Sequence, residues 1–194
     1  MKIVSLELKN YRNCINVLLD FSKQKTLIIG KNAQGKTNIL ESIYLLSDLK
    51  SPRTSSLLDL INFQTDSFEI NADVLKNNTD IELNFSYNNE KKKEHKINKV
   101  KTRPKEFKSV VKTVLFSTKD LLLLRGTPQD RRDWLDRAIS QIYPAYDERL
   151  SKYEKIRIQK NNLLKSEEID STLLEIYNEQ LAVTGANIIF LRKI

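Results

Sequence analysis

The chain has 194 residues, of which 40% are hydrophobic and 30% are charged, and its formal net charge is +8. This apolar fraction can support a packed core, and the length suits one large domain or one and a half. Cys14 is the only cysteine and His95 the only histidine, so an intrachain disulfide, a cysteine zinc cluster and a histidine-based catalytic triad are excluded. The basic balance favours an anionic partner, with nucleic acid first and anionic lipid second.

The first segments of the chain alternate between apolar and polar residues. Residues 3–9 and 15–21 place apolar side chains at every second position on either side of a turn at 10–13, which predicts an antiparallel strand pair. The alternation starts directly after the first residues, so we expect no signal peptide, and no apolar run approaches the length of a membrane span. These features predict a cytoplasmic protein.

A phosphate-binding pattern follows. The apolar run 27–29 predicts a buried strand, residues 38–47 predict a helix, and the segment between them fits G-x-x-x-x-G-K-[ST]. In this pattern the glycines permit unusual backbone angles, successive N–H groups surround a phosphate, the lysine reaches the β- and γ-phosphates, and the hydroxyl binds Mg²⁺. We therefore expect ATP and Mg²⁺ here, with Thr37 as the Mg²⁺ ligand. The loop consists of Gly30, Lys31, Asn32, Ala33, Gln34, Gly35, Lys36 and Thr37.

The segment after the helix is polar at 48–57 and predicts a loop, with one short helical turn at 57–61. Residues 68–74 and 81–87 alternate again, with turn signals at 77–78 and 88–89, and predict an antiparallel meander.

Residues 90–112 form a basic strip with ten lysines or arginines against three glutamates. Two interpretations stay open: the strip is the solvated face of an exposed hairpin, or it meets DNA phosphates. It lacks interleaved aromatic residues, so stacking on single strands is not supported. The candidate DNA contacts are Lys91, Lys92, Lys93, Lys96, Lys99, Lys101, Arg103 and Lys105.

The remaining residues are mainly helical in pattern. Apolar residues at 110–116 predict one more buried strand, and 121–124 fits either strand or helix. Thr127, Pro128 and Asp130 predict a helix start, and the helix that follows has an apolar face. Helices from 144 and from 171, joined across 167–170, predict an antiparallel hairpin. The sequence ends inside an apolar period, which we interpret as a truncated chain. The apolar face comprises Trp134, Leu135, Ala138, Ile139 and Ile142.

Short segments in a consistent order and spacing match one known family at residues 6–13, 30–46, 51–55, 114–117, 126–128, 131–132, 135–136, 146, 159–161 and 163–165. Together these segments resemble the RecF family of DNA replication and repair proteins. The resemblance implies an α/β fold, namely the lobe of an ABC-type ATPase head like that of SMC proteins. Its mixed sheet and antiparallel meander are followed by an inserted helical arm. We assign residues 1–125 to the N-terminal part of the head and 126–194 to a helical arm that is incomplete at its C-terminus.

The resemblance also implies a function. RecF-type heads dimerise on ATP with the nucleotide between subunits, bind gapped DNA or single-stranded/duplex junctions, and help to load the recombinase together with RecO and RecR. A slow, DNA-stimulated ATPase and a part in the SOS response to DNA damage are implied for the full-length dimer. The resemblance implies that Arg53 matches an arginine that contacts nucleotide or senses DNA in related heads, and that Arg12 matches one that lies near the phosphates.

The chain departs from the family pattern in three places. Lys160 stands where the family usually has arginine, which removes bidentate hydrogen bonding there. The sequence has no Leu-Ser-x-Gly-Gln signature segment and no apolar strand that ends in two carboxylates. Because phosphoryl transfer depends on such positioning and charge-stabilising groups, we expect this chain to bind ATP and hardly hydrolyse it.

Two alternatives remain. The first is the ATPase head of an SMC-like or overcoming-lysogenization-type nuclease, which requires a separate acidic metal site. The second is a small P-loop kinase, which requires an arginine-rich lid and an acceptor pocket.

Overall fold

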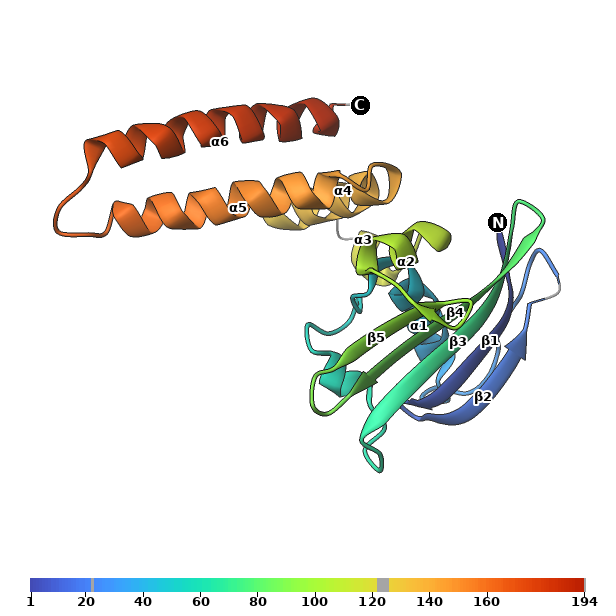
Figure 1. Cartoon of the computed structure of the whole chain (residues 1–194). Coiled ribbons are helices and arrows are strands. Elements are labelled where there is room, and N and C mark those ends of the chain that lie inside the picture. Colours follow the sequence, from blue (N-terminus) through green and yellow to red (C-terminus); the bar gives the residue numbers. More distant parts are fainter. Residues whose placement is uncertain (22, 122–125, 194) are drawn as a thin grey trace. The chain divides into compact units, whose positions relative to one another are not determined.

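A computed structural model describes residues 1–21, 23–121 and 126–193, and the chain divides into two units, Met1–Leu115 and Phe116–Ile194 (Figure 1). We describe each unit by itself. The predicted boundary after residue 125 falls later than this division, at a residue outside the described ranges, and stays a prediction.

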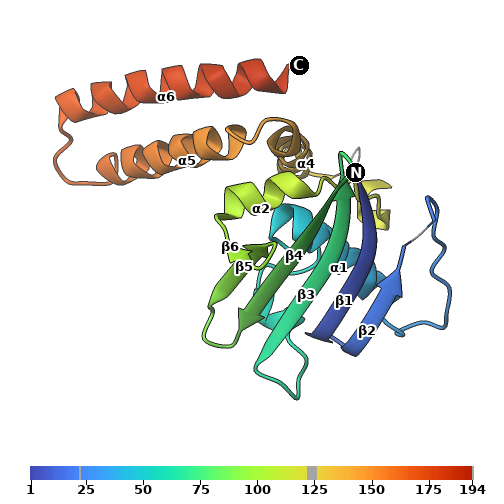
Figure 2. The same ribbon diagram turned by 45° about the vertical axis from the view of Figure 1, so that its right-hand side comes forward.

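The first unit is built on a six-stranded sheet with the order β2-β1-β3-β4-β5-β6 (Figure 2). The predicted strand pair and meander are confirmed, with Leu8 opposite Val17 and Ile70 opposite Phe85. All pairs among the described strands are antiparallel, whereas a mixed sheet was expected. The strands are β1 (Lys2–Tyr11), β2 (Cys14–Asp20), β3 (Ser67–Lys76), β4 (Thr79–Asn88), β5 (Lys93–Ile97) and β6 (Val100–Lys101).

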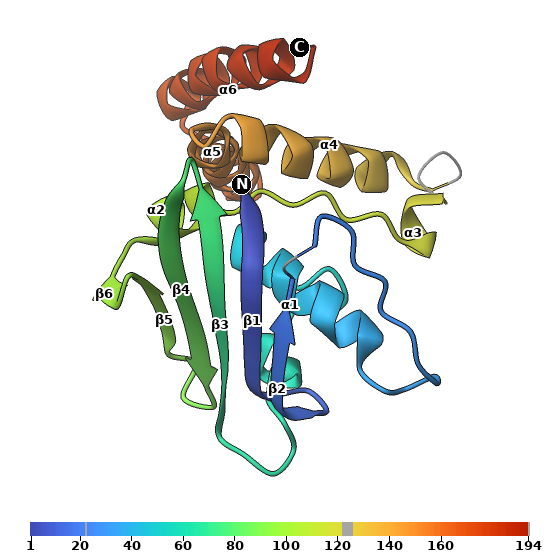
Figure 3. The same ribbon diagram turned by 90° about the vertical axis from the view of Figure 1, so that its right-hand side faces the viewer.

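Helix α1 (Lys36–Asp48) covers one face of this sheet (Figure 3). Because side chains alternate along a strand, Leu6 and Leu8 of β1 both face the helix, and they pack in one core with Leu45 and Leu46 of α1. The predicted helical turn is the 3₁₀ helix η1 (Leu57–Leu60), and α2 (Pro104–Val110) follows the last strand. This core fixes the start of α1, where the phosphate-binding pattern lies.

Two predicted buried strands are not formed. Residues 27–29 are irregular, and Leu27 and Ile29 are 84% and 80% exposed. Val110 and Val111 are buried, but Val114 and Phe116 are 99% and 74% exposed in another irregular stretch. A strand needs a hydrogen-bonding neighbour as well as apolar residues. No described strand pairs with either segment, so the apolar composition alone gave a wrong prediction in both places.

The second unit is helical, with α3 (Thr118–Leu121), α4 (Pro128–Ile142), α5 (Tyr146–Leu163) and α6 (Ser171–Arg192). Helix α4 starts where predicted, with Thr127 and Asp130 forming a reciprocal capping box. Helices α5 and α6 form the predicted antiparallel hairpin (Figure 1). No helix among the described residues is long and apolar enough to cross a membrane.

The apolar face predicted for α4 is only partly buried. Ile139 packs with Tyr146 and Ile188, but Trp134 and Ile142 are 42% and 70% exposed. Helical periodicity predicts which side chains share a face, and it does not reveal how wide the packed part of that face is. The strand-or-helix prediction for 121–124 falls mostly on residues 122–125, which lie outside the described ranges.

His95 is a buried polar residue in the core of the first unit. Its ring stacks on Phe85 with 5.3 Å between centroids and lies 5.6 Å from the Phe107 ring, and its Nε2 has no hydrogen-bond partner among the described residues. Burial, reinforced by the charges of Lys93 and Lys101, lowers the pKa of His95 below its usual value. The folded protein therefore holds this ring neutral.

We expect this histidine to make stability depend on pH. Its pKa is lower in the folded than in the unfolded chain, so its contribution is complete above about pH 6.5 and is lost as the pH falls below that value. One such group gives a slope of at most about 1.4 kcal/mol per pH unit. Urea unfolding at pH 7.5, 6.5 and 5.5 measures it. His95→Phe should make the free energy of unfolding depend less on pH between 7.5 and 5.5. An unchanged slope in this variant would contradict the role of His95 in the pH dependence.

Candidate functional site

The segment Gly30–Thr37 forms a tight loop that leads into α1. Gly35, the residue before the helix, has φ of 92°, which a side chain rarely adopts. A Cβ atom there would also lie 3.0 Å from Asn13 Oδ1. Ala33 has φ of 64°, also in the left-handed region. The loop therefore has a shape that requires glycine at position 35, and the predicted helix start at its end is confirmed.

The loop presents donors and a cation at the N-terminus of α1. The Lys36 ammonium donates to the carbonyl oxygens of Gly30 and Lys31 at 2.7 and 2.6 Å, so it lies across the mouth of the loop. Within the described part of the chain, the backbone N–H groups of residues 32–37 donate to no protein acceptor. Thr37 is exposed in the first helical turn, and its hydroxyl is likewise without a described partner.

These features fit a phosphate group. Several free N–H donors, a helix N-terminus and an ammonium ion together favour an anion of high charge density. The exposed hydroxyl of Thr37 is a hard oxygen ligand of the type that Mg²⁺ accepts beside water and phosphate.

A buried carboxylate lies one helical turn from the loop. Glu41 of α1 is 1% exposed and accepts two hydrogen bonds from Arg12, at 2.6 Å from Nε and 2.8 Å from Nη2. Arg53 donates to the same carboxylate at 3.1 Å, and Ser51 donates to it at 2.5 Å. Burial alone raises the pKa of Glu41, but the bonds from Arg12 and Ser51 and the charges of both arginines outweigh it and hold that pKa below the usual value.

Two asparagines connect this carboxylate cluster to the loop. Arg53 Nη1 donates to Asn38 Oδ1 at 2.6 Å, Asn38 Nδ2 donates to Asn13 Oδ1 at 2.7 Å, and Asn13 Nδ2 donates to the Ala33 carbonyl at 3.1 Å. Asn38 directly follows Thr37 in the sequence. The chain of bonds therefore runs from the segment after α1 to the middle of the loop.

The structure thus brings both predicted arginines, Arg12 and Arg53, to one carboxylate beside the loop. Sequence reasoning missed Glu41, because a glutamate within a helical period normally faces solvent. Two signals could have found it: Glu41 lies four residues after Thr37, hence on the same helix face, and two arginines near one site need a counter-charge.

The basic strip lies at the β5–β6 edge of the sheet and continues into α2. Four of its lysines pair with glutamates: Lys92 with Glu90, Lys96 and Lys101 with Glu94, and Lys99 with Glu82. Arg103 precedes α2 and Lys105 lies in its first turn, so these two are not on the expected pair of strands. Lys91 and Lys92 lie in the turn between β4 and β5, Lys93 and Lys96 lie on β5, and Lys99 and Lys101 follow on the β5–β6 hairpin. The lysines are therefore spread along the whole length of β5, and acidic neighbours reduce the net charge of this edge.

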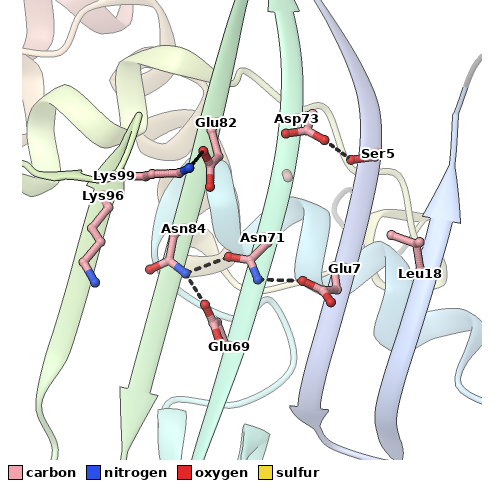
Figure 4. A pocket seen from close by; sticks show the side chains of 11 residues that line it. Ser5, Glu7, Leu18, Glu69, Asn71, Asp73, Glu82, Asn84, Lys96 and Lys99 are labelled. Carbon is pink, nitrogen blue, oxygen red and sulfur yellow. Dashed lines mark hydrogen bonds and ion pairs between the residues drawn. The ribbon is translucent and has the colours of Figure 1, made fainter.

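The face of the sheet opposite α1 carries a shallow pocket of about 460 Å³ (Figure 4). Its polar groups mostly bond to one another: Asn71 donates to Glu7 at 2.9 Å, Asn84 donates to Asn71 at 2.7 Å, and Ser5 donates to Asp73 at 2.5 Å. The carboxylates would repel a phosphate, although Lys96 and Lys99 also line the pocket. This pocket therefore matches a phosphate less well than the loop does.

Comparison with known proteins identifies the family. The sequence profile of the AAA ATPase domain family matches residues 1–189, which is nearly the whole chain. This chain belongs to the AAA ATPase domain family. The loop described above is consistent with that membership.

Two relatives refine the comparison within AAA ATPase domains. The chain is 39% identical over 199 residues to the DNA replication and repair protein RecF of Natranaerobius thermophilus, covering all of this chain and 52% of that protein. It is 38% identical to RecF of Bacillus subtilis, covering 99% of this chain and 53% of that one. The chain therefore spans about half the length of the curated relatives it matches, and its predicted resemblance to RecF proteins is confirmed.

Solved structures agree on the fold of this AAA ATPase domain. A structure of the recombination mediator protein RecF with ATP superposes with a TM-score of 0.90 at 35% identity, over 98% of this chain and 52% of that chain. An SMC ATPase structure from a study of ATP-driven dimerisation superposes with a TM-score of 0.60 at 19% identity, over 70% of this chain and 98% of that one. The predicted likeness to SMC-type ATPase heads is confirmed at the level of fold.

Proposed function

We propose that this chain is the N-terminal part of the ATP-binding head of a cytoplasmic DNA replication and repair protein in which ATP controls binding to DNA. The observation that carries the proposal is the loop Gly30–Thr37, with its free N–H groups and with the Lys36 ammonium at its mouth. The identity of 39% to a RecF protein, over the whole length of this chain, supports it. In this proposal the loop surrounds the phosphates of ATP, Thr37 supplies a hydroxyl to Mg²⁺, and Arg12 and Arg53 stand beside the terminal phosphate.

Nucleotide binding is tested directly by calorimetric titration of the 194-residue chain with Mg·ATP and with Mg·ADP. We expect one site for each nucleotide and ATP turnover close to background, because the sequence lacks both the paired carboxylates and the signature segment. Absence of binding heat together with an unchanged melting temperature in saturating ATP would overturn the proposal.

Further properties are proposed for a protein of the relatives' full length. They are an ATP-dependent homodimer, preference for gapped DNA or single-stranded/duplex junctions, and work with RecO and RecR in recombinase loading. The relatives at 38–39% identity, which carry the RecF name, support this proposal. No observation favours the nuclease or the kinase alternative.

For DNA we propose that the lysines of the basic strip contact phosphates. Lys91 lies in the turn before β5 with φ of 62°, Lys92 is 77% exposed, and Lys93 begins β5. Duplex DNA presents one charge about every 1.7 Å of its axis, so cations spaced along a hairpin can neutralise several phosphates without reading the base sequence.

Charge reversal tests this contact. We expect Lys91→Glu/Lys92→Glu/Lys93→Glu to weaken binding to a random duplex and to reduce the slope of log K against log salt by up to about 3, because three phosphate contacts are lost. Fluorescence anisotropy at several salt concentrations measures both values. The control reverses three exposed lysines of the helical unit, Lys152, Lys155 and Lys165, with the same change in net charge. Equal slopes of log K against log salt for the parent and the strip variant would show that the basic strip does not contact DNA.

A further inference from the structure

The carboxylate of Glu41 binds two arginine side chains beside the phosphate loop. Its two oxygens accept four hydrogen bonds from three side chains, Arg12, Ser51 and Arg53. The carboxylate is 1% exposed, whereas the Arg53 side chain is 42% exposed. One buried negative charge therefore holds two cations, and the cluster keeps an excess positive charge on its solvent side.

Arg12 is fixed on the inner side of this cluster. Besides its two bonds to Glu41, its Nη1 donates to the Asp59 carbonyl at 3.2 Å and its backbone N–H donates to the Leu60 carbonyl at 2.7 Å. Its φ of 51° is unusual for a residue with a side chain. With the guanidinium bonded bidentately and the backbone held on both sides, Arg12 acts as the permanent partner of Glu41.

Arg53 is held more loosely. It reaches the carboxylate only through Nη1, and the same atom donates to Asn38 Oδ1. In the described part of the chain its Nε and Nη2 groups bond to no protein acceptor, so an arginine with five donors retains several for another anion. Asn38, which accepts the bond from Arg53, directly follows Thr37 in the sequence. In the phosphate-binding pattern Thr37 belongs to the end of the loop that meets the β- and γ-phosphates, so Arg53 is bonded at the end where a terminal phosphate would bind.

We propose that Glu41 is a positioning residue that presents Arg53 to the terminal phosphate, so that the Arg12–Glu41–Arg53 cluster makes the loop prefer a nucleoside triphosphate to a diphosphate. This inference rests on the proposed nucleotide binding and adds the source of its selectivity. Glu41 touches no nucleotide itself. Its charge and shape determine where the guanidinium of Arg53 lies, and Arg12 compensates the carboxylate so that Arg53 keeps its charge for the ligand.

The test compares the ratio of the dissociation constants for Mg·ADP and Mg·ATP, measured by calorimetry, for the parent protein and four variants. We expect Glu41→Gln, which keeps the side-chain volume and loses the charge, to lower the ratio by about tenfold. Arg53→Gln should lower it by a similar factor. The double variant should be no worse than Arg53→Gln alone, because Glu41 acts through Arg53. Glu82→Gln, the same change on the opposite face of the sheet, should leave the ratio unchanged.

Different outcomes separate a positioning role from a structural one. Glu41→Gln could leave the ratio of the two dissociation constants constant and still lower the melting temperature or weaken the binding of both nucleotides by the same factor. In that case Glu41 has only a structural role and the proposal is overturned. If the two single variants combine additively, Glu41 does not act through Arg53 and the proposal is also overturned. If Glu41→Gln does not fold, Arg53→Gln alone tests the proposal, because Arg53 is exposed. A ratio equal to that of the parent in this variant would show that Arg53 does not contact the terminal phosphate, and the proposal would be overturned.

Failure of the underlying function gives a separate result. A parent protein that binds neither nucleotide overturns both the proposed function and this inference. A parent that binds ATP and ADP equally keeps the proposed function and overturns the inference alone.

Discussion

Lys36→Ala should weaken ATP binding by roughly 100-fold or more. The Lys36 ammonium lies across the loop mouth, 2.7 and 2.6 Å from two carbonyl oxygens, where a bound phosphate would meet it. A charge-assisted hydrogen bond is worth about 1.5–3 kcal/mol, and here one cation faces a polyanion with more than one such bond. Removal of the cation leaves the phosphate charge beside two bare carbonyl oxygens, so the loss exceeds that of one neutral hydrogen bond.

Calorimetric titration with Mg·ATP measures this effect, and thermal unfolding without nucleotide checks that the variant folds. Lys50→Ala is the matched control, because it removes an exposed lysine just after α1 and lowers the net charge by the same amount. Comparable ATP affinity for Lys36→Ala and Lys50→Ala would show that the loop is not the binding site, whatever the family membership.

Local patterns in the sequence were enough to predict most of the first unit. The loop, α1, the β1–β2 pair and the β3–β4 meander follow from periodicities of 3.6 and 2 and from turn residues, which act over short distances along the chain. The start of α4 followed from Thr127 and Asp130 for the same reason. These features depend on neighbours in sequence, so they can be read without knowing the tertiary structure.

The wrong predictions concern features that depend on distant neighbours. Leu27, Ile29 and Val114 are apolar, and a run of apolar residues predicts burial, but burial in a sheet requires a partner strand that local sequence does not specify. Glu41 is the converse case: a charged residue is buried because arginines 29 residues before it and 12 after it converge on its carboxylate. Such convergence is visible only in three dimensions.

The helical unit contains a second charge cluster, which is partly buried and connects three helices. Asp136 of α4 accepts two hydrogen bonds from Arg192 of α6, at 2.9 Å from Nε and 2.8 Å from Nη2. Tyr146 of α5 donates its hydroxyl to the same carboxylate at 2.5 Å and accepts from Arg192 Nε at 3.1 Å. Burial, together with the bond to Asp136, raises the pKa of Tyr146 to about 12, so the hydroxyl remains a donor at neutral pH.

We expect Asp136→Ala to destabilise this unit by about 2–3 kcal/mol. The side chains of Asp136 and Arg192 are only 13% and 26% exposed, so removal of the carboxylate leaves a partly buried guanidinium and a buried hydroxyl without their acceptor. The value lies below that of a fully buried pair because solvent reaches Arg192. For a unit of this size, each kcal/mol corresponds to a fall in melting temperature of about 4–8 °C.

Thermal unfolding followed by circular dichroism at 222 nm, a wavelength at which helices dominate the signal, measures the effect. Asp133→Ala is the matched control, since Asp133 lies on the exposed side of the same helix and accepts a hydrogen bond from Gln129 at 2.6 Å. A double-mutant cycle with Arg192→Ala then isolates the pairwise term. If the cluster acts as the geometry indicates, the double variant is less destabilised than the sum of the two single variants, because the second substitution removes the charge that the first one left unpaired. Additive effects, or equal melting temperatures for Asp136→Ala and Asp133→Ala, would mean that the three helices are held by apolar packing of Ile139 and Ile188 instead.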